Sequence, residues 1–174
     1  IRGREFTLFN LIPAVSTAVG VSAVPQLSSA AAAGDKRLLR ERTGLLLKIS
    51  ACIALPSGLG MTALSAGINS LLYGGAGHLQ TGSRMLAIYG AAAVFAGIAI
   101  PAVQALQAIG KKGAALIILS VSALVKLAGN LLLVSQKDIN IYGAAISTCL
   151  LYFSALVPAL VILAKHTGGF NAGA

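Results

Sequence analysis

Two residues that are able to bind a solute lie four positions apart in an otherwise uncharged, apolar stretch of the chain. They are Lys126 and Asn130, and residues 113–134 around them contain no other charged side chain. A spacing of four places both residues on one face of a helix. At membrane depth a cation costs at least about 2.5–3.5 kcal/mol, so Lys126 is expected to face a bundle interior or a water-filled cavity. There the pair would bind an anionic solute; alternatively, Lys126 snorkels outward or pairs with a carbonyl of a kinked neighbouring helix.

Three further polar residues are candidates for the same solute path. Gln104 and Gln107 lie three positions apart near the end of the apolar stretch 85–109, so they share a helix face. They either contact the substrate or hydrogen-bond a neighbouring helix. Arg4 precedes the first apolar stretch and either reaches an outer vestibule or lies in solvent. The predicted substrate-binding residues are therefore Lys126, Asn130, Gln104, Gln107 and Arg4.

The sequence patterns required for catalysis or for metal binding are not found. The four acidic residues all lie at the ends of apolar stretches or between them: Glu5, Asp35, Glu41 and Asp138. His78 and His166 are expected on opposite sides of the membrane, and Cys52 and Cys149 form no CxxC pair. The Gly-Lys-Lys turn at 110–112 lacks the first glycine and the final hydroxyl residue of a phosphate-binding loop. We therefore expect neither enzymatic activity nor a metal or cofactor.

The composition excludes the soluble classes of protein. The chain of 174 residues is 57% hydrophobic and 10% charged, with a mean hydropathy of +0.88. Soluble domains are about 45–50% apolar and about 25% charged. Lys and Arg outnumber Asp and Glu by 13 to 4, which in a membrane protein reflects cationic cytoplasmic loops. A soluble enzyme, a nucleic-acid-binding protein and a disordered tail are therefore not expected.

Five apolar stretches are long enough to cross a membrane as helices, which takes about 20 residues. They are residues 7–33, 44–72, 85–109, 113–134 and 139–164. Strands of a membrane barrel would be runs of about 10 residues that alternate in polarity. The sequence instead predicts an all-α integral membrane bundle over 1–164, with a tail at 165–174. Asp35 is expected to cap the helix that follows the first span, and the basic segment 38–42 to lie at the lipid headgroups before the second span.

The basic residues indicate how the bundle is oriented. One side of the predicted spans carries Lys36, Arg37, Arg40, Arg42, Lys111, Lys112 and Lys165, and the other side carries Arg2, Arg4, Arg84 and Lys137. The positive-inside rule makes the first side cytoplasmic. Tyr73, Tyr89 and Tyr142 fall toward the opposite helix ends, where a belt of interfacial aromatic residues is expected.

The order of four motifs resembles the C-terminal lobe of the multidrug/oligosaccharidyl-lipid/polysaccharide (MOP) flippase superfamily. The motifs are VPQLS at 24–28 followed by AAAGD at 31–35, ALPSGL at 54–59 followed by LLYG at 71–74, ALQAIGK at 105–111, and KLAGN at 126–130 followed by IYGAAIST at 141–148. They cover nearly the whole chain in the order typical of the superfamily. The chain is most similar to the branch that contains the stage V sporulation protein B and lipid II flippase MurJ families.

This resemblance implies a fold and a function. The five spans would be the second to sixth helices of the second six-helix lobe of a transporter with about twelve to fourteen helices, and the N-terminal lobe would lie outside this chain. Such transporters flip undecaprenyl-pyrophosphate-linked sugars, such as lipid II, to the outer leaflet of the bacterial cytoplasmic membrane by alternating access. The implied partners are this lipid-linked oligosaccharide, membrane lipids and the missing lobe, with no nucleic acid. Some members bind sodium on the helix equivalent to 113–134, where Lys126 brings its own positive charge.

Two alternative functions stay open at this point. A cation-coupled multidrug exporter of the same superfamily would have acidic residues within its helices, and the five predicted spans contain none at membrane depth. A membrane fragment that is inactive by itself is the other alternative, because half of a cavity cannot alternate its access.

Overall fold

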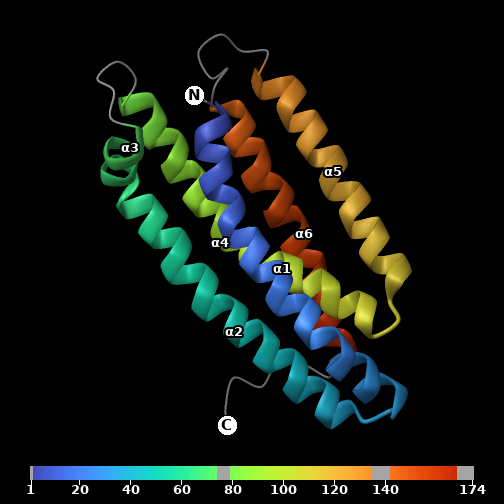
Figure 1. Ribbon diagram of the computed structural model, residues 1–174. Coiled ribbons are helices and arrows are strands. Elements are labelled where there is room, and N and C mark those ends of the chain that lie inside the picture. The colour runs from blue at the N-terminus through green and yellow to red at the C-terminus, as the bar shows by residue number, and fades with distance from the viewer. Residues whose placement is uncertain (1, 74–78, 135–141, 168–174) are drawn as a thin grey trace.

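Six α-helices make up the described part of the computed structural model, which covers residues 2–73, 79–134 and 142–167 (Figure 1). They are α1 (Arg2–Ala32), α2 (Lys36–Ala63), α3 (Ser65–Tyr73), α4 (Leu79–Ala108), α5 (Lys112–Val134) and α6 (Gly143–Thr167). All except the short α3 are long and apolar enough to cross a membrane. The predicted all-α bundle with five membrane-spanning helices is therefore confirmed.

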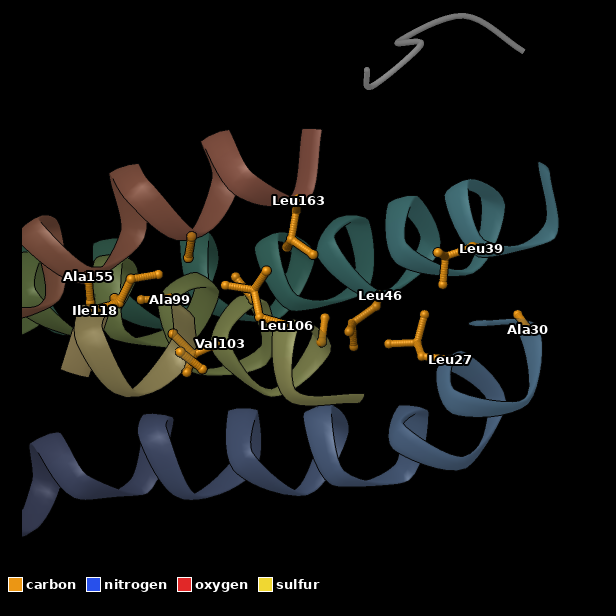
Figure 2. Packing of buried hydrophobic residues seen from close by; sticks show 14 residues of the cluster. Leu27, Ala30, Leu39, Leu46, Ala99, Val103, Leu106, Ile118, Ala155 and Leu163 are labelled. Atoms are coloured by element: carbon orange, nitrogen blue, oxygen red, sulfur yellow. The ribbon is translucent and has the colours of Figure 1, made fainter. Parts of the chain in front are cut away.

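Helix α4 forms the centre of the bundle. In its apolar window 61% of the residues are buried, against 22–28% in the other four long helices. Helices α1, α2 and α6 pack around α4, whereas α5 packs mainly against α6. Figure 2 shows Leu106 of α4 in one apolar cluster with Leu27 of α1, Leu46 of α2 and Leu163 of α6.

Small side chains on α4 make this central position possible. Ala92, Ala93, Ala96, Ala99 and Ala102 are all buried, and at 3.6 residues per turn they cover about half of the helix circumference. Lipid offers no hydrophobic drive for helices to associate, so close packing between small residues has to supply the attraction. Helix α4 can therefore be approached closely from several sides.

Helix α2 begins earlier than the sequence predicts, at Lys36. Asp35 caps it as expected, since its carboxylate accepts the backbone N–H of Leu38 at 3.0 Å. The basic segment 38–42, expected at the lipid headgroups before the second span, forms the first turns of α2 and is continuous with that span; its position at the headgroups stays a prediction. Leu39, Thr43 and Leu46 recur at helical spacing and are buried against the bundle, so packing continues the helix through the charged residues.

The second predicted span, 44–72, is not one helix. The structure divides it at Leu64 into α2 and α3. Just before the break, Thr62 lies with its hydroxyl 2.9 Å from the carbonyl of Gly58 on its own helix and 3.2 Å from that of Ala87 on α4. A hydroxyl shared with a preceding carbonyl competes with regular helix geometry. The break therefore coincides with the contact between α2 and α4.

Other helix boundaries differ by a few residues from those predicted. Helix α4 begins at Leu79 rather than at 85, and α6 extends to Thr167, which takes three residues from the predicted tail at 165–174. The remainder of that tail, and residues 139–141 of the predicted fifth span, lie outside the described residues. Tyr89, expected in an interfacial belt, is instead buried in the core, where its ring lies 5.4 Å from that of Phe9.

Helices α2 and α4 approach each other closely where they cross, at Gly58 and Gly90. A Cβ atom added to Gly58 would lie 2.7 Å from the carbonyl oxygen of Gly90, and one added to Gly90 would lie 2.8 Å from that of Gly58. Both obstacles are backbone atoms, which cannot rotate aside as a side chain can. A side chain at either position therefore forces the two helices apart.

We expect Gly58→Leu to lower the free energy of unfolding by about 1–3 kcal/mol, because it overpacks this crossing. Gly60→Leu is the matched control, since a Cβ atom at Gly60 meets nothing within 4 Å and leucine favours the helix over glycine. Thermal unfolding of the purified protein in detergent measures both. Equal unfolding temperatures for the two variants would contradict the crossing described here.

Candidate functional site

One face of α5 carries three polar residues at intervals of four. Ser122 is buried at 2% exposure, and Lys126 and Asn130 are half-buried. Residues four apart on a helix lie above one another, so these three side chains form a single stripe. Each step along it is about 6 Å, from the rise of 1.5 Å per residue. The stripe runs from the middle of the apolar span, at Ser122, toward its C-terminal end.

Asn130 takes part in the contact between α5 and α6. The hydroxyl of Ser147 on α6 lies 2.6 Å from Oδ1 of Asn130, to which it donates, and 3.0 Å from the carbonyl oxygen of Ala144. The helices are close at this level, because a Cβ atom added to Gly129 would lie 3.0 Å from Cβ of Ser147. Asn130 therefore positions α5 through its carbonyl oxygen and leaves its amide N–H groups to bind another molecule.

Lys126 differs from its neighbours in the stripe. Among the described residues its ammonium group has neither a hydrogen-bond partner nor an ion pair. Pairing with a backbone carbonyl of a kinked helix, one of the sequence-based alternatives, is not observed in that part of the chain. A charged group that is half-buried in a membrane-spanning helix has its positive charge available for an anion.

A pocket of about 280 Å³ lies between α4, α5 and α6, beside this stripe. Gln104 and Gln107 of α4 both line it, as the prediction of a shared face requires, and Ser122 of α5 and Tyr152 of α6 line it from the other helices. Lys126 lies one helical turn from Ser122. The structure thus brings two predicted residues, Gln104 and Gln107, to one pocket with two residues that were not predicted, Ser122 and Tyr152. Lys126 does not line this pocket.

Two polar atoms in this pocket have no hydrogen-bond partner among the described residues. They are Oε1 of Gln104 and Oγ of Ser122, both buried. An unpaired buried polar group costs about 1–3 kcal/mol, and buried polar atoms normally bind protein, water or ligand. Oε1 of Gln104 is packed against Gly20 of α1, which does not line the pocket, and a Cβ atom added to Gly20 would overlap it. The residues that line the pocket therefore include two buried hydrogen-bonding groups that the described part of the chain leaves unpaired.

One predicted residue, Arg4, and three residues that were not predicted from the sequence complete the polar groups of the site region. Arg4 lies in the first turns of α1, and its side chain is outside what the structure describes. Ser122 and Tyr152 were not predicted; the spacing of four from Lys126 would have identified Ser122, whereas Tyr152 required the packing of α6. Lys48 was also missed, although it interrupts the apolar stretch 44–72, and it is exposed on α2.

Comparison with known proteins gives one match. A model of the family described as Lipid II flippase MurJ matches residues 11–174. No curated protein matches the chain, and no solved structure matches it.

The bond between Ser147 and Asn130 can be tested with a double-mutant cycle. We expect Ser147→Ala to lower the free energy of unfolding by about 0.6–1.7 kcal/mol, the range of hydrogen bonds between membrane helices. In a protein that already carries Ser147→Ala, Asn130→Ala should lower the free energy of unfolding little further, because the two residues share the bond. Ser154→Ala is the control, since Ser154 bonds only to Leu151 of its own helix. Fully additive effects in thermal unfolding would exclude the bond.

Proposed function

Because the chain belongs to the lipid II flippase MurJ family, we propose that its five spans form part of the second lobe of a flippase for undecaprenyl-pyrophosphate-linked sugars. Members of this family are transporters and not enzymes, and their substrate is a lipid-linked wall precursor. In our proposal the polar stripe of α5 and the glutamines of α4 lie along the route of the substrate's head group.

The charge of Lys126, which has no partner among the described residues, is the observation that supports this route. A pyrophosphate-linked sugar is a polar anion, which cannot enter hydrocarbon without replacing its hydration. A fixed cation at membrane depth replaces part of that hydration, and the amide and hydroxyl groups of Gln104, Gln107 and Ser122 can bind the sugar or the bridging oxygens. The polyprenyl tail would remain in lipid throughout.

The protein is a multi-pass membrane protein, and we propose that it lies in the bacterial cytoplasmic membrane. The positive-inside rule would orient it with the α1–α2 and α4–α5 turns and the end of α6 in the cytoplasm. Alternating access further requires a first lobe, which is the proposed partner of this bundle. A role in sporulation, implied by the resemblance to stage V sporulation protein B, stays a prediction.

The test uses the full coding sequence, expressed in cells depleted of their own lipid II flippase, with outer-leaflet lipid II as the measured quantity. We expect the full protein to restore outer-leaflet lipid II and Lys126→Gln to reduce the transport rate about tenfold, since one charge–anion contact is lost. Lys126→Arg keeps the charge and should retain most of the rate. Lys48→Gln is the matched control because it removes an equal charge from the exposed surface of α2.

The outcomes distinguish the flippase function of the protein from the role of Lys126 in the substrate route. Rescue by both the full protein and Lys126→Gln would support the flippase function and exclude Lys126 from the route. Failure of the correctly inserted full protein would exclude lipid II as its substrate in that host. An equal loss in Lys126→Gln and Lys48→Gln would mean that total charge, and not the position of Lys126, affects transport.

A further inference from the structure

A second polar cavity lies at the end of the bundle where three parts of the chain meet. The α1–α2 turn and the α4–α5 turn lie at the same end (Figure 1), and the last turn of α6 joins them there. The cavity measures about 210 Å³. Lys36, Lys111 and His166 line it, one from each of these three parts. None of the residues that line this cavity also lines the pocket beside Lys126, and the proposed transport route does not use them.

The two turns hold their lysines in fixed positions. Gly34 and Gly110 both have positive φ values, +69° and +83°, which residues with a side chain rarely adopt. At the second turn the N–H of Lys111 bonds to the carbonyl of Leu106 at 2.9 Å, and that of Gly110 bonds to the carbonyl of Gln107 at 3.1 Å. This is the double-bonded helix end of a Schellman motif. The backbones that carry Lys36 and Lys111 are therefore set in place before any ligand binds.

The charge in the cavity favours an anion. Lys36, Lys111 and His166 line the cavity together with one acidic residue, Asp35, so its lining holds two lysines and a single carboxylate. This carboxylate is already engaged, because it accepts the N–H of Leu38 at the start of α2. Helix α5 also begins here, directly after Lys111. A lysine side chain has no acceptor atom to cap the first N–H groups of that helix, and such N–H groups attract anions.

The floor of the cavity is apolar. Ala30, Ala31, Leu39 and Ile109 line it beneath the charged groups. A cavity for a free inorganic ion would gain nothing from such a surface, whereas the glycerol and first acyl carbons of a lipid would be buried on it. Basic pockets between membrane helices on the cytoplasmic side are known to bind anionic headgroups.

We propose that this basic-end cavity binds the phosphate group of an anionic phospholipid of the surrounding leaflet, with Lys36, Lys111 and His166 as its ligands. The lipid bridges the two turns and the end of α6, and so joins α1, α2, α4 and α6 at this end of the bundle. The inference does not depend on the proposed transport function.

The test is a lipid titration of the full-length protein in detergent, followed by native mass spectrometry. The two lipids are phosphatidylglycerol, which is anionic, and phosphatidylcholine, which has no net charge. We expect the first phosphatidylglycerol to bind at least about tenfold more tightly than phosphatidylcholine. Lys36→Gln combined with Lys111→Gln should weaken phosphatidylglycerol binding about tenfold, because two charges near the headgroup are removed.

The matched control is Lys112→Gln combined with Lys165→Gln. These lysines lie next to cavity residues and are exposed, yet they do not line the cavity. The control pair removes the same charge from the same end and should weaken binding less than twofold. Lys111→Gln alone changes only an exposed turn and should weaken phosphatidylglycerol binding about threefold. This single variant replaces the double variant in the test if the double variant does not fold.

Three results would overturn the proposal. One is equal weakening in the cavity pair and the control pair, which would mean general attraction to a basic surface. A second is equal affinity for the two lipids. The third is displacement of phosphatidylglycerol by an equal concentration of inorganic phosphate, which would assign the cavity to the free anion.

Discussion

The bundle depends on how closely other helices can approach α4. In hydrocarbon no water is released when two apolar helices meet, so attraction comes from dispersion contacts and from the few hydrogen bonds that close packing permits. The alanines of α4 and the paired glycines at its crossing with α2 provide this close packing. Helices α1, α2 and α6 are positioned by it, and α5 is positioned in turn by α6. A single bulky residue on α4 would therefore displace several helices together.

The polar groups at membrane depth follow from this arrangement. Gln104 is half-buried on the central helix α4, and Gly20 of α1 leaves the space that its amide occupies. Ser122 and Lys126 lie on α5, which contacts α4 only weakly and so leaves a pocket between them. Close packing and polar lining thus lie on two faces of α4: the tightly packed face holds the bundle, and the looser face toward α5 lines the pocket with Gln104 and Gln107.

The sequence predicts the five spans well because an apolar run of about 20 residues has few other structures in a membrane. The sequence predicts less well the helix boundaries that are decided by packing between helices. Residues 38–42 look like an interfacial segment by charge, yet the buried positions of Leu39 and Thr43 continue α2 through them. The break at Leu64 has no glycine or proline to mark it and coincides with a contact of Thr62 with α4. Lys126 was found from its charge alone, whereas placing the glutamines of α4 in one pocket with Ser122 required the fold.

The dependence of α5 on α6 has a consequence for how the protein is made. Helices enter the membrane in chain order during synthesis, and α5 emerges before its main packing partner exists. At that stage Lys126 and Asn130 face lipid or the translocation channel, and the hydroxyl of Ser147 has not yet been synthesised. Only when α6 inserts can the two close as a helical hairpin, with the Asn130–Ser147 bond fixing their register. A ribosome that stalls between these helices would thus leave a polar span in the membrane without its main packing partner.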